Sequence, residues 1–267
     1  KREKATSNIC TAQALLASMA GMYAVYHGPE GLRRVASNIH TGASYLAGKL
    51  KELGYTLPNE NFFDTLHISL TGSPDEDKIK ELALEKEINF YYPGNHSVQF
   101  SVDESCKEEE LNTILEIFSL AKKKAVHFDT ELEVITTLDQ KHLRKDELLT
   151  QQVFNSFHSE TELMRYIHML EKKDISLTQS MISLGSCTMK LNAASQLMPV
   201  SWPEFTNIHP FVPINQTEGY HQLIIELEHA LMEITGFEAI SFQPNSGASG
   251  EYTGLMVIQA YQEARGE

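Results

Sequence analysis

The stretch A-I-S-F-Q-P-N-S-G-A-S-G-E-Y, residues 239–252, decides the expected fold of this chain. Residues 239–243 predict a strand, and a tight turn of small residues is expected to lead from Asn245 into a helix. A helix start offers backbone N–H groups without intrahelical partners at the positive end of the helix dipole, so it suits a phosphate. Small side chains let a ligand approach the backbone closely, and they occupy this turn at Ser246, Gly247, Ala248, Ser249 and Gly250. On spacing alone, an ordinary strand-to-helix turn is favoured over a ligand site, because glycine-rich turns are common.

Two earlier segments are the other candidates for a site. S-L-G-S-C-T-M-K-L-N, residues 183–192, predicts an irregular segment that either lines a pocket or crosses a domain surface as a structural arm. In W-P-E-F-T-N-I-H-P-F, residues 202–211, His209 lies in a proline-rich loop and either faces a ligand or fixes the loop by hydrogen bonds. The residue types leave both alternatives open in both segments.

These blocks resemble the glycine cleavage system P-protein family. K-A-T-S-N-I-C-T-A-Q-A-L-L, residues 4–16, and V-F-N-S-F-H-S-E-T-E-L-M-R-Y, residues 153–166, are similar to the same family, so the resemblance covers nearly the whole chain. The family's full chain is a tandem of two related halves. We therefore expect this chain to be an internal piece that runs from late in the first half into the early part of the second.

The resemblance implies a pyridoxal 5′-phosphate enzyme of glycine catabolism. Such an enzyme decarboxylates glycine and passes the aminomethyl group to the lipoyl arm of the H-protein. The implied partners are glycine and the lipoylated H-protein, and the full-length protein is expected to be a homodimer. The expected location is the cytoplasm in a bacterium and the mitochondrial matrix in a eukaryote.

The resemblance also implies roles for residues of the turn. Fold-type I pyridoxal-phosphate enzymes hold the phosphate at such a helix start, which assigns it to Ser246, Gly247 and Ala248, with Asn245 as the helix cap. The pocket wall is expected to include Ser186, Cys187, Thr188 and His209. The cofactor-binding lysine belongs to a motif N-L-H-K that is absent here and is expected downstream, so no catalytic residue is assigned. Lys190 is interpreted as a structural or surface lysine.

Two alternatives stand beside this interpretation. The first is another fold-type I aminotransferase or decarboxylase, which gives no reason for the blocks at 153–166 and 183–192. The second is a non-catalytic fragment or scaffold that packs against a partner half through the apolar faces of its helices.

Composition excludes several classes of protein. The net charge of −14 over 267 residues argues against a nucleic-acid surface, and no apolar run approaches the roughly 20 residues that span a bilayer. The wide spacing of Cys10, Cys106 and Cys187 fits neither a disulfide framework nor a zinc site. No metal site is expected, since the pairs His27/His40 and His158/His168 lack a third ligand at suitable spacing.

The expected fold class is α/β, made of pieces of fold-type I pyridoxal-phosphate-dependent transferase domains. We expect a helical segment at 1–57, an α+β small domain at 58–127, a linker and helix at 128–180, and the start of a second transferase-like half at 181–267. Residues 128–150 predict a linker or mobile loop, and Lys122, Lys123 and Lys124 a solvated helix end. The predicted elements are helices at 15–26 and 32–53 broken by H-G-P-E-G, a strand at 66–70, a helix after Ser73-Pro74, a hairpin joining 89–92 to 97–102, and helices at 111–118, 163–170, 223–234 and from Tyr252 onward.

Overall fold

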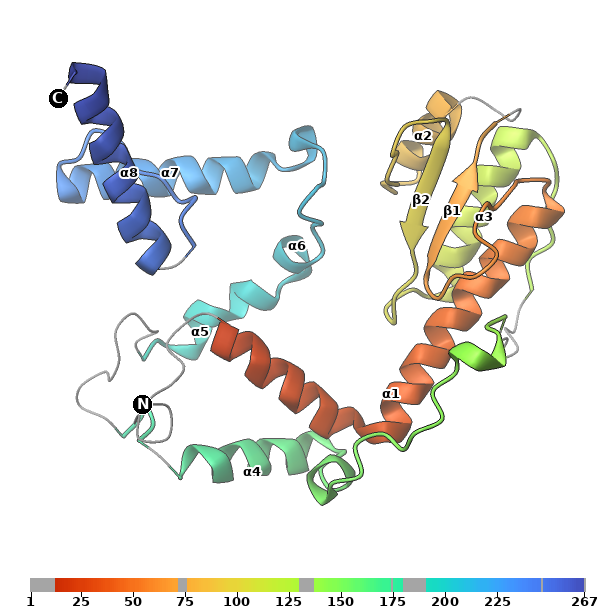
Figure 1. Cartoon of the computed structure of the whole chain (residues 1–267), viewed down its shortest axis with the longest axis horizontal. Helices are drawn as coiled ribbons and strands as arrows, with labels where there is room; N and C mark the ends of the chain where they lie inside the picture. Colours follow the sequence, from red (N-terminus) through yellow and green to blue (C-terminus); the bar gives the residue numbers. More distant parts are fainter. Residues whose placement is uncertain are drawn as a thin grey trace. The chain divides into compact units, whose positions relative to one another are not determined.

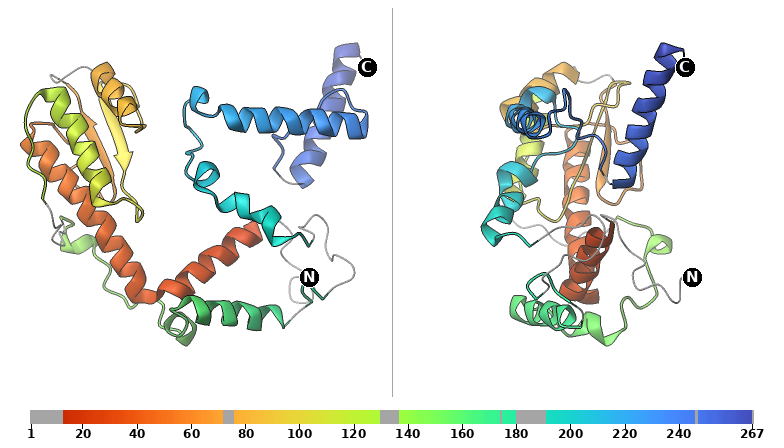
Figure 2. Two further views of the ribbon diagram at one scale, coloured as in Figure 1. Left: turned by 180° about the vertical axis from the view of Figure 1, so that it is seen from behind. Right: turned by 90° about the vertical axis from the view of Figure 1, so that its left-hand side faces the viewer.

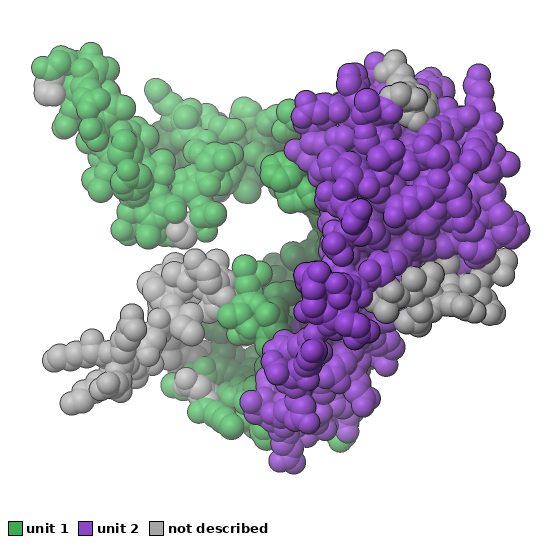
Figure 3. Space-filling model, turned by 45° about the vertical axis from the view of Figure 1, so that its right-hand side comes forward, with its two compact units in different colours: residues 1–22, 164–267 green, residues 23–163 purple. Residues whose placement is uncertain are grey.

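A computed structural model describes residues 13–71, 76–129, 137–173, 175–179, 191–245 and 247–266 (Figure 1). The chain divides into two compact units, which Figure 3 colours separately. One unit comprises residues 23–163, and the other comprises residues 1–22 with 164–267.

A two-stranded antiparallel sheet and three helices form the core of the unit 23–163. Strands β1 (Thr65–Ser69) and β2 (Ser97–Ser101) pair in the register Thr65 with Ser101 through Ser69 with Ser97. Alternate residues Leu66 and Ile68 on β1 and Val98 on β2 are buried, as the two-residue period of a strand requires. The helices that share this core are the second half of α1 (Gln13–Glu52), α2 (Glu76–Glu85) and α3 (Glu108–Lys122).

The predicted helices and first strand of this unit are confirmed, but the predicted hairpin is only partly correct. Tyr91 alone pairs with Gln99, through two backbone hydrogen bonds of 3.0 and 2.8 Å, while β2 forms its long ladder with β1. Phe90 instead turns into the core, where its ring lies 5.1 Å from Phe100 and 5.7 Å from Phe118. Burial of this ring therefore replaces further strand pairing.

Helix α1 bends sharply at Gly28, within the predicted H-G-P-E-G break (Figure 2). Gly28 has φ 61° and ψ −176°, a conformation open to glycine because other residues place a Cβ too close to the backbone. His158 secures the bend: its Nδ1–H donates to the carbonyl oxygen of Tyr26 at 2.8 Å, so a segment more than a hundred residues away closes over the break.

The lysines at the end of α3 form contacts with α1, in addition to the solvated helix end that the sequence predicts. The Nζ of Lys122 donates to the carbonyl oxygen of Gly54 at 2.5 Å and lies 4.1 Å from the centre of the Tyr55 ring. Lys124 donates to the carbonyl oxygen of Glu52. These cations cap the C-terminus of α1, where carbonyl groups lack intrahelical partners and cations are stabilising.

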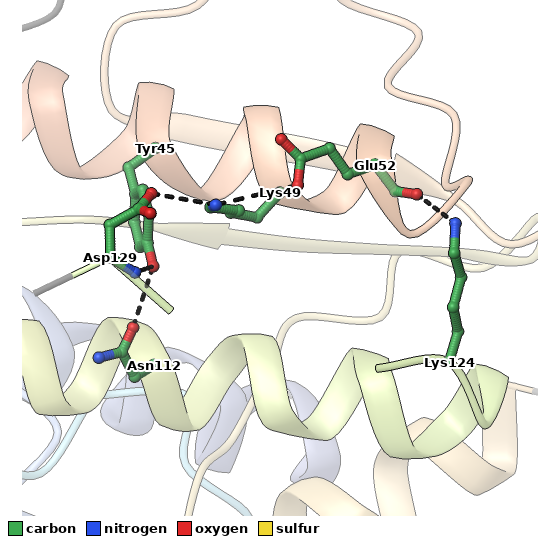
Figure 4. A network of polar contacts seen from close by, with 6 residues as sticks. All are labelled: Tyr45, Lys49, Glu52, Asn112, Lys124 and Asp129. Carbon is green, nitrogen blue, oxygen red and sulfur yellow. Dashed lines mark hydrogen bonds and ion pairs between the residues drawn. The ribbon is translucent and has the colours of Figure 1, made fainter. Parts of the chain in front are cut away.

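The beginning of the expected linker is attached to α1 and α3 (Figure 4). The carboxylate of Asp129 forms a 3.0 Å ion pair with Lys49, and its backbone N–H donates to the Tyr45 hydroxyl at 3.2 Å. That hydroxyl donates in turn to Asn112 of α3 at 3.2 Å. Asp129 is therefore held in place, and the expectation of a linker or mobile loop over residues 128–150 stays a prediction.

Tyr55→Phe is expected to lower the free energy of unfolding by about 1 kcal/mol. The buried Tyr55 hydroxyl donates to the carbonyl oxygen of Phe118 at 2.9 Å, and burial raises the pKa of Tyr55, which keeps it a neutral donor. Urea denaturation followed by far-ultraviolet circular dichroism measures the change. Tyr91→Phe is the matched control because its side chain is 65% exposed, and equal effects of the two substitutions would contradict the assignment.

In the other unit, the described residues form a set of helices with exposed apolar side chains. One bond of the capping box predicted before α4 is present, the N–H of Glu162 donating to the Ser159 hydroxyl at 3.3 Å, and that hydroxyl donates to the Glu162 carboxylate at 2.9 Å. Gly236, at φ 75°, ends α7 as predicted. Leu223 and Leu227 of α7 are 47% and 45% exposed. The remaining described helices of the chain are η2 (Gln140–His142), η3 (Gln152–Asn155), α4 (Glu160–Glu171), α5 (Ala194–Leu197), η4 (Met198–Ser201), α6 (Pro203–Thr206), η5 (Ile214–Gln216), α7 (Glu218–Thr235) and α8 (Gly247–Arg265).

The predicted strand at residues 239–243 is wrong. These residues are extended chain without regular structure, and they pair with no strand among the described residues. A strand is stabilised by its ladder, so an apolar run without a neighbour stays irregular. The predicted α/β class is confirmed as a mixture of helices with a small sheet. The bounds of the four predicted segments of the chain stay predictions.

Candidate functional site

The start of α8 is the best-defined part of the predicted site. The helix begins at Gly247, which places Asn245 two positions before its first residue; Ser246 lies outside the described residues. Asn245, Gly247 and Ala248 are exposed. The first turn contains no acidic residue, so no negative charge within that turn opposes an anion.

The space around Gly247 is open. A Cβ built on Gly247 meets no atom within 4 Å, so the backbone of the first turn is open to a ligand. The N–H groups of a helix's first turn lack intrahelical acceptors, and they lie at the positive end of the dipole of a 19-residue helix. These residues therefore suit a phosphate chemically, and their role as its binding site stays a prediction.

His209 lies in the loop between α6 and η5, on the same compact unit as α8. Its Nδ1 accepts a 3.1 Å hydrogen bond from the backbone N–H of Phe211, and its carbonyl oxygen accepts one of 3.0 Å from Val212. An imidazole nitrogen that accepts from an amide carries no proton, so in the neutral ring the proton lies on Nε2. His209 thus fixes its own loop, as one of the two alternatives predicted. A role in the pocket wall stays a prediction.

The remaining predicted pocket residues lie outside the described part of the chain. They are Ser186, Cys187 and Thr188, and the neighbouring Lys190 is outside it as well. The structure therefore describes the helix start and the His209 loop, while residues 183–190 lie outside the described part of the chain.

Other reactive groups in the described residues do not form a second site. The thiol of Cys106 is partly buried, and burial raises its pKa, which disfavours the reactive thiolate. The described ranges contain no group of three or more histidine, cysteine, aspartate or glutamate side chains able to hold a metal ion. No helix within those ranges is long and apolar enough to cross a bilayer.

Two histidine contacts in the structure are not predicted by the sequence. His158 closes over the bend at Gly28, and His40 contacts Thr137. The only local signal was that His40 falls on the apolar face of the second half of α1. Contacts between residues 97 positions apart leave no periodic pattern in a sequence.

Comparison with known proteins agrees with the resemblance. Residues 1–118 match the sequence model of the glycine cleavage system P-protein family. The whole chain is 56% identical over 268 residues to the glycine dehydrogenase (decarboxylating) of Christiangramia forsetii, and 52% identical over 267 residues to that of Bacteroides thetaiotaomicron. Along its whole length, the chain is similar to the glycine cleavage system P-proteins. A mitochondrial relative from Dictyostelium discoideum is 46% identical over 273 residues.

The chain spans 28% of the length of the two bacterial relatives and 27% of the mitochondrial one, while each alignment covers 100% of the chain. A crystal structure of glycine decarboxylase (P-protein) in an inhibitor-bound form is 30% identical and matches with a TM-score of 0.37, over 45% of this chain and 29% of that one.

Proposed function

We propose that this chain is part of a pyridoxal 5′-phosphate-dependent glycine dehydrogenase (decarboxylating). The observation that carries the proposal is the 56% identity to a relative of that name, sustained along 100% of this chain. The blocks at 153–166 and 183–192, which the competing aminotransferase interpretation leaves without a reason, fall within that alignment.

The proposed role of this chain is to bind the cofactor's phosphate and to form part of the pocket wall. Asn245, Ser246, Gly247 and Ala248 would hold the phosphate through the start of α8, with the support described above for Gly247. Bound pyridoxal phosphate supplies an electron sink for the electrons left when glycine loses carbon dioxide. Fixing the phosphate orients the reacting atoms against the protein, which lowers the entropic cost of reaction.

The proposed pocket wall consists of Ser186, Cys187, Thr188 and His209. Their task would be to orient the glycine carboxylate and to exclude water. A backbone hydrogen bond fixes the His209 ring, and a fixed side chain positions a substrate with little loss of entropy on binding.

The proposed partners are glycine and the lipoyl arm of the H-protein, which accepts the aminomethyl group, and the whole protein is proposed to be a homodimer. Its proposed location is the cytoplasm in a bacterium or the mitochondrial matrix in a eukaryote. Relatives from bacteria and a relative named as mitochondrial support both possibilities.

A chimera tests the function. Residues 1–267 replace the matching segment of the Christiangramia forsetii relative, and release of carbon dioxide from carboxyl-labelled glycine is measured with pyridoxal phosphate and lipoylated H-protein. We expect a rate comparable to that of the unchanged relative, and we expect it to depend on both additions. A chimera that melts like the relative and binds the cofactor but releases no carbon dioxide would favour the scaffold alternative.

A further inference from the structure

His40 of α1 makes two hydrogen bonds whose partners have fixed roles. Its side chain is 4% exposed, and its Nδ1 lies 2.9 Å from the carbonyl oxygen of Phe63. A carbonyl oxygen only accepts, so Nδ1 carries a proton and donates. Its Nε2 lies 3.1 Å from the backbone nitrogen of Thr137. A backbone N–H only donates, so Nε2 accepts and carries no proton. The two partners together select one neutral tautomer of the ring.

Uncharged groups surround this ring. The Phe63 ring stacks on it at 5.8 Å between centroids with an interplanar angle of 4°, and the Phe62 ring lies 6.0 Å away. The hydroxyls of Ser44 and Thr137 lie 3.4 and 3.2 Å from Nε2. Among the residues that the structure describes, the groups that contact the ring therefore include no carboxylate to pair with a protonated imidazole.

Among the described residues, the nearest charged ones along the three packed segments already have partners or lie further along the helix. Asp64, beside Phe63, accepts from the Thr65 hydroxyl at 2.8 Å. Asp139, beside Thr137, pairs with Lys141 at 2.9 Å and accepts from its backbone N–H. On α1 the nearest charged side chains in sequence are Arg34 and Lys49, and Lys49 pairs with Asp129 at 3.0 Å.

Residues 40–49 of α1 therefore bind two residues of the segment that follows α3. Lys49 and Tyr45 hold Asp129, and His40 with Ser44 holds Thr137. The chemistry of the two attachments differs. A lysine–carboxylate pair keeps both charges between about pH 5 and 8, whereas histidine is the side chain whose charge ordinarily changes in that range.

We propose that His40 is a proton-operated latch that holds residues 137–139 on α1. Protonation adds an N–H at Nε2, so that the ring then has two N–H groups. The new N–H faces the N–H of Thr137, and Nε2 no longer accepts the hydrogen bond of that amide. A hydroxyl can turn a lone pair toward the protonated ring, but a backbone N–H cannot, so the amide of Thr137 loses its partner. The hydrogen bond from the Thr137 amide to Nε2 is present while the His40 ring is neutral and is lost when the ring gains a proton, while Asp129 stays attached.

Nuclear magnetic resonance on the 267-residue chain tests the latch. The nitrogen shifts of labelled histidine report the tautomer, and hydrogen exchange reports protection of the Thr137 amide relative to its intrinsic rate at each pH. We expect His40 to carry its proton on Nδ1 near pH 8. Once acidification has protonated His40, as the same nitrogen shifts report, we expect protection of Thr137 to fall by up to about tenfold, the scale of one lost hydrogen bond.

Two variants provide the matched comparison. His40→Gln offers a side-chain oxygen to the Thr137 amide and has no proton to gain, so protection should be equal before and after the same acidification. His67→Gln alters a histidine on β1 and should leave the pH dependence intact. A neutral ring with its proton on Nε2, protection of Thr137 that persists after His40 is protonated, or loss of protection with pH in His67→Gln and His40→Gln alike would each overturn the proposal.

Discussion

Gly28→Ala is expected to reduce the free energy of unfolding by roughly 2–5 kcal/mol, a large part of the ~5–15 kcal/mol that stabilises a typical domain. Two physical causes add. Gly28 has φ 61° and ψ −176°, a region that a residue with a Cβ rarely adopts. The added Cβ would also lie 2.6 Å from Cε1 of His158 and 2.7 Å from the carbonyl oxygen of Phe154. One of the two contacts is with backbone, so rotation of a side chain cannot relieve it.

Urea denaturation followed by far-ultraviolet circular dichroism measures this loss. Gly48→Ala is the matched control, since Gly48 lies on the same helix, is exposed and has no atom within 4 Å of an added Cβ. That substitution should be neutral or stabilising by up to about 1 kcal/mol, because alanine favours helix over glycine. Equal effects of the two substitutions would show that neither the bend nor the His158 segment constrains Gly28.

Local chemistry explains which parts of the fold could be predicted. The bend in α1 follows from glycine and proline in H-G-P-E-G, and the end of α7 follows from Gly236, because the conformational preferences of these residues are properties of a few neighbouring positions. The capping box at Ser159 is a hydrogen bond between residues three positions apart, so its pattern is visible in the sequence.

Pairing over long separations explains the errors. The sequence places 89–92 beside 97–102 through a short turn, but β2 pairs mainly with β1, whose residues lie 28 to 36 positions away from their partners. Residues 239–243 have the apolar character of a strand and no partner among the described residues. The amide of Thr137 meets His40 across 97 positions, which periodicity cannot indicate.

The candidate site likewise has parts that local sequence patterns predict and parts that they do not. The helix start at Gly247 was predictable because small residues followed by a helical apolar pattern define it locally. The backbone hydrogen bond from Phe211 to His209 is local as well, and the sequence left it as one of two alternatives. What the pocket contains depends on how distant segments meet, which local patterns do not determine.

Gly247→Val, placed in the chimera with the Christiangramia forsetii relative, is expected to weaken pyridoxal phosphate binding by orders of magnitude. A branched side chain would occupy the space where the first-turn N–H groups face the phosphate. Each charge-assisted hydrogen bond lost costs roughly 1.5–3 kcal/mol, or about tenfold to more than a hundredfold in affinity. Folding should change little, because an added Cβ meets no atom within 4 Å and Gly247 does not have the positive φ at which a side chain is strained.

Thermal melts with and without pyridoxal phosphate separate binding from folding. The variant should melt without cofactor within a few degrees of the unsubstituted chimera, and it should lose the stabilisation that bound cofactor adds in proportion to the logarithm of its concentration over Kd. Gly254→Val is the control, since Gly254 lies further along α8 and also has no atom within 4 Å of an added Cβ. That variant should keep the cofactor-induced shift. If Gly247→Val keeps the full shift as well, the start of α8 does not hold the phosphate, and an ordinary turn into a helix is the better account of residues 245–251.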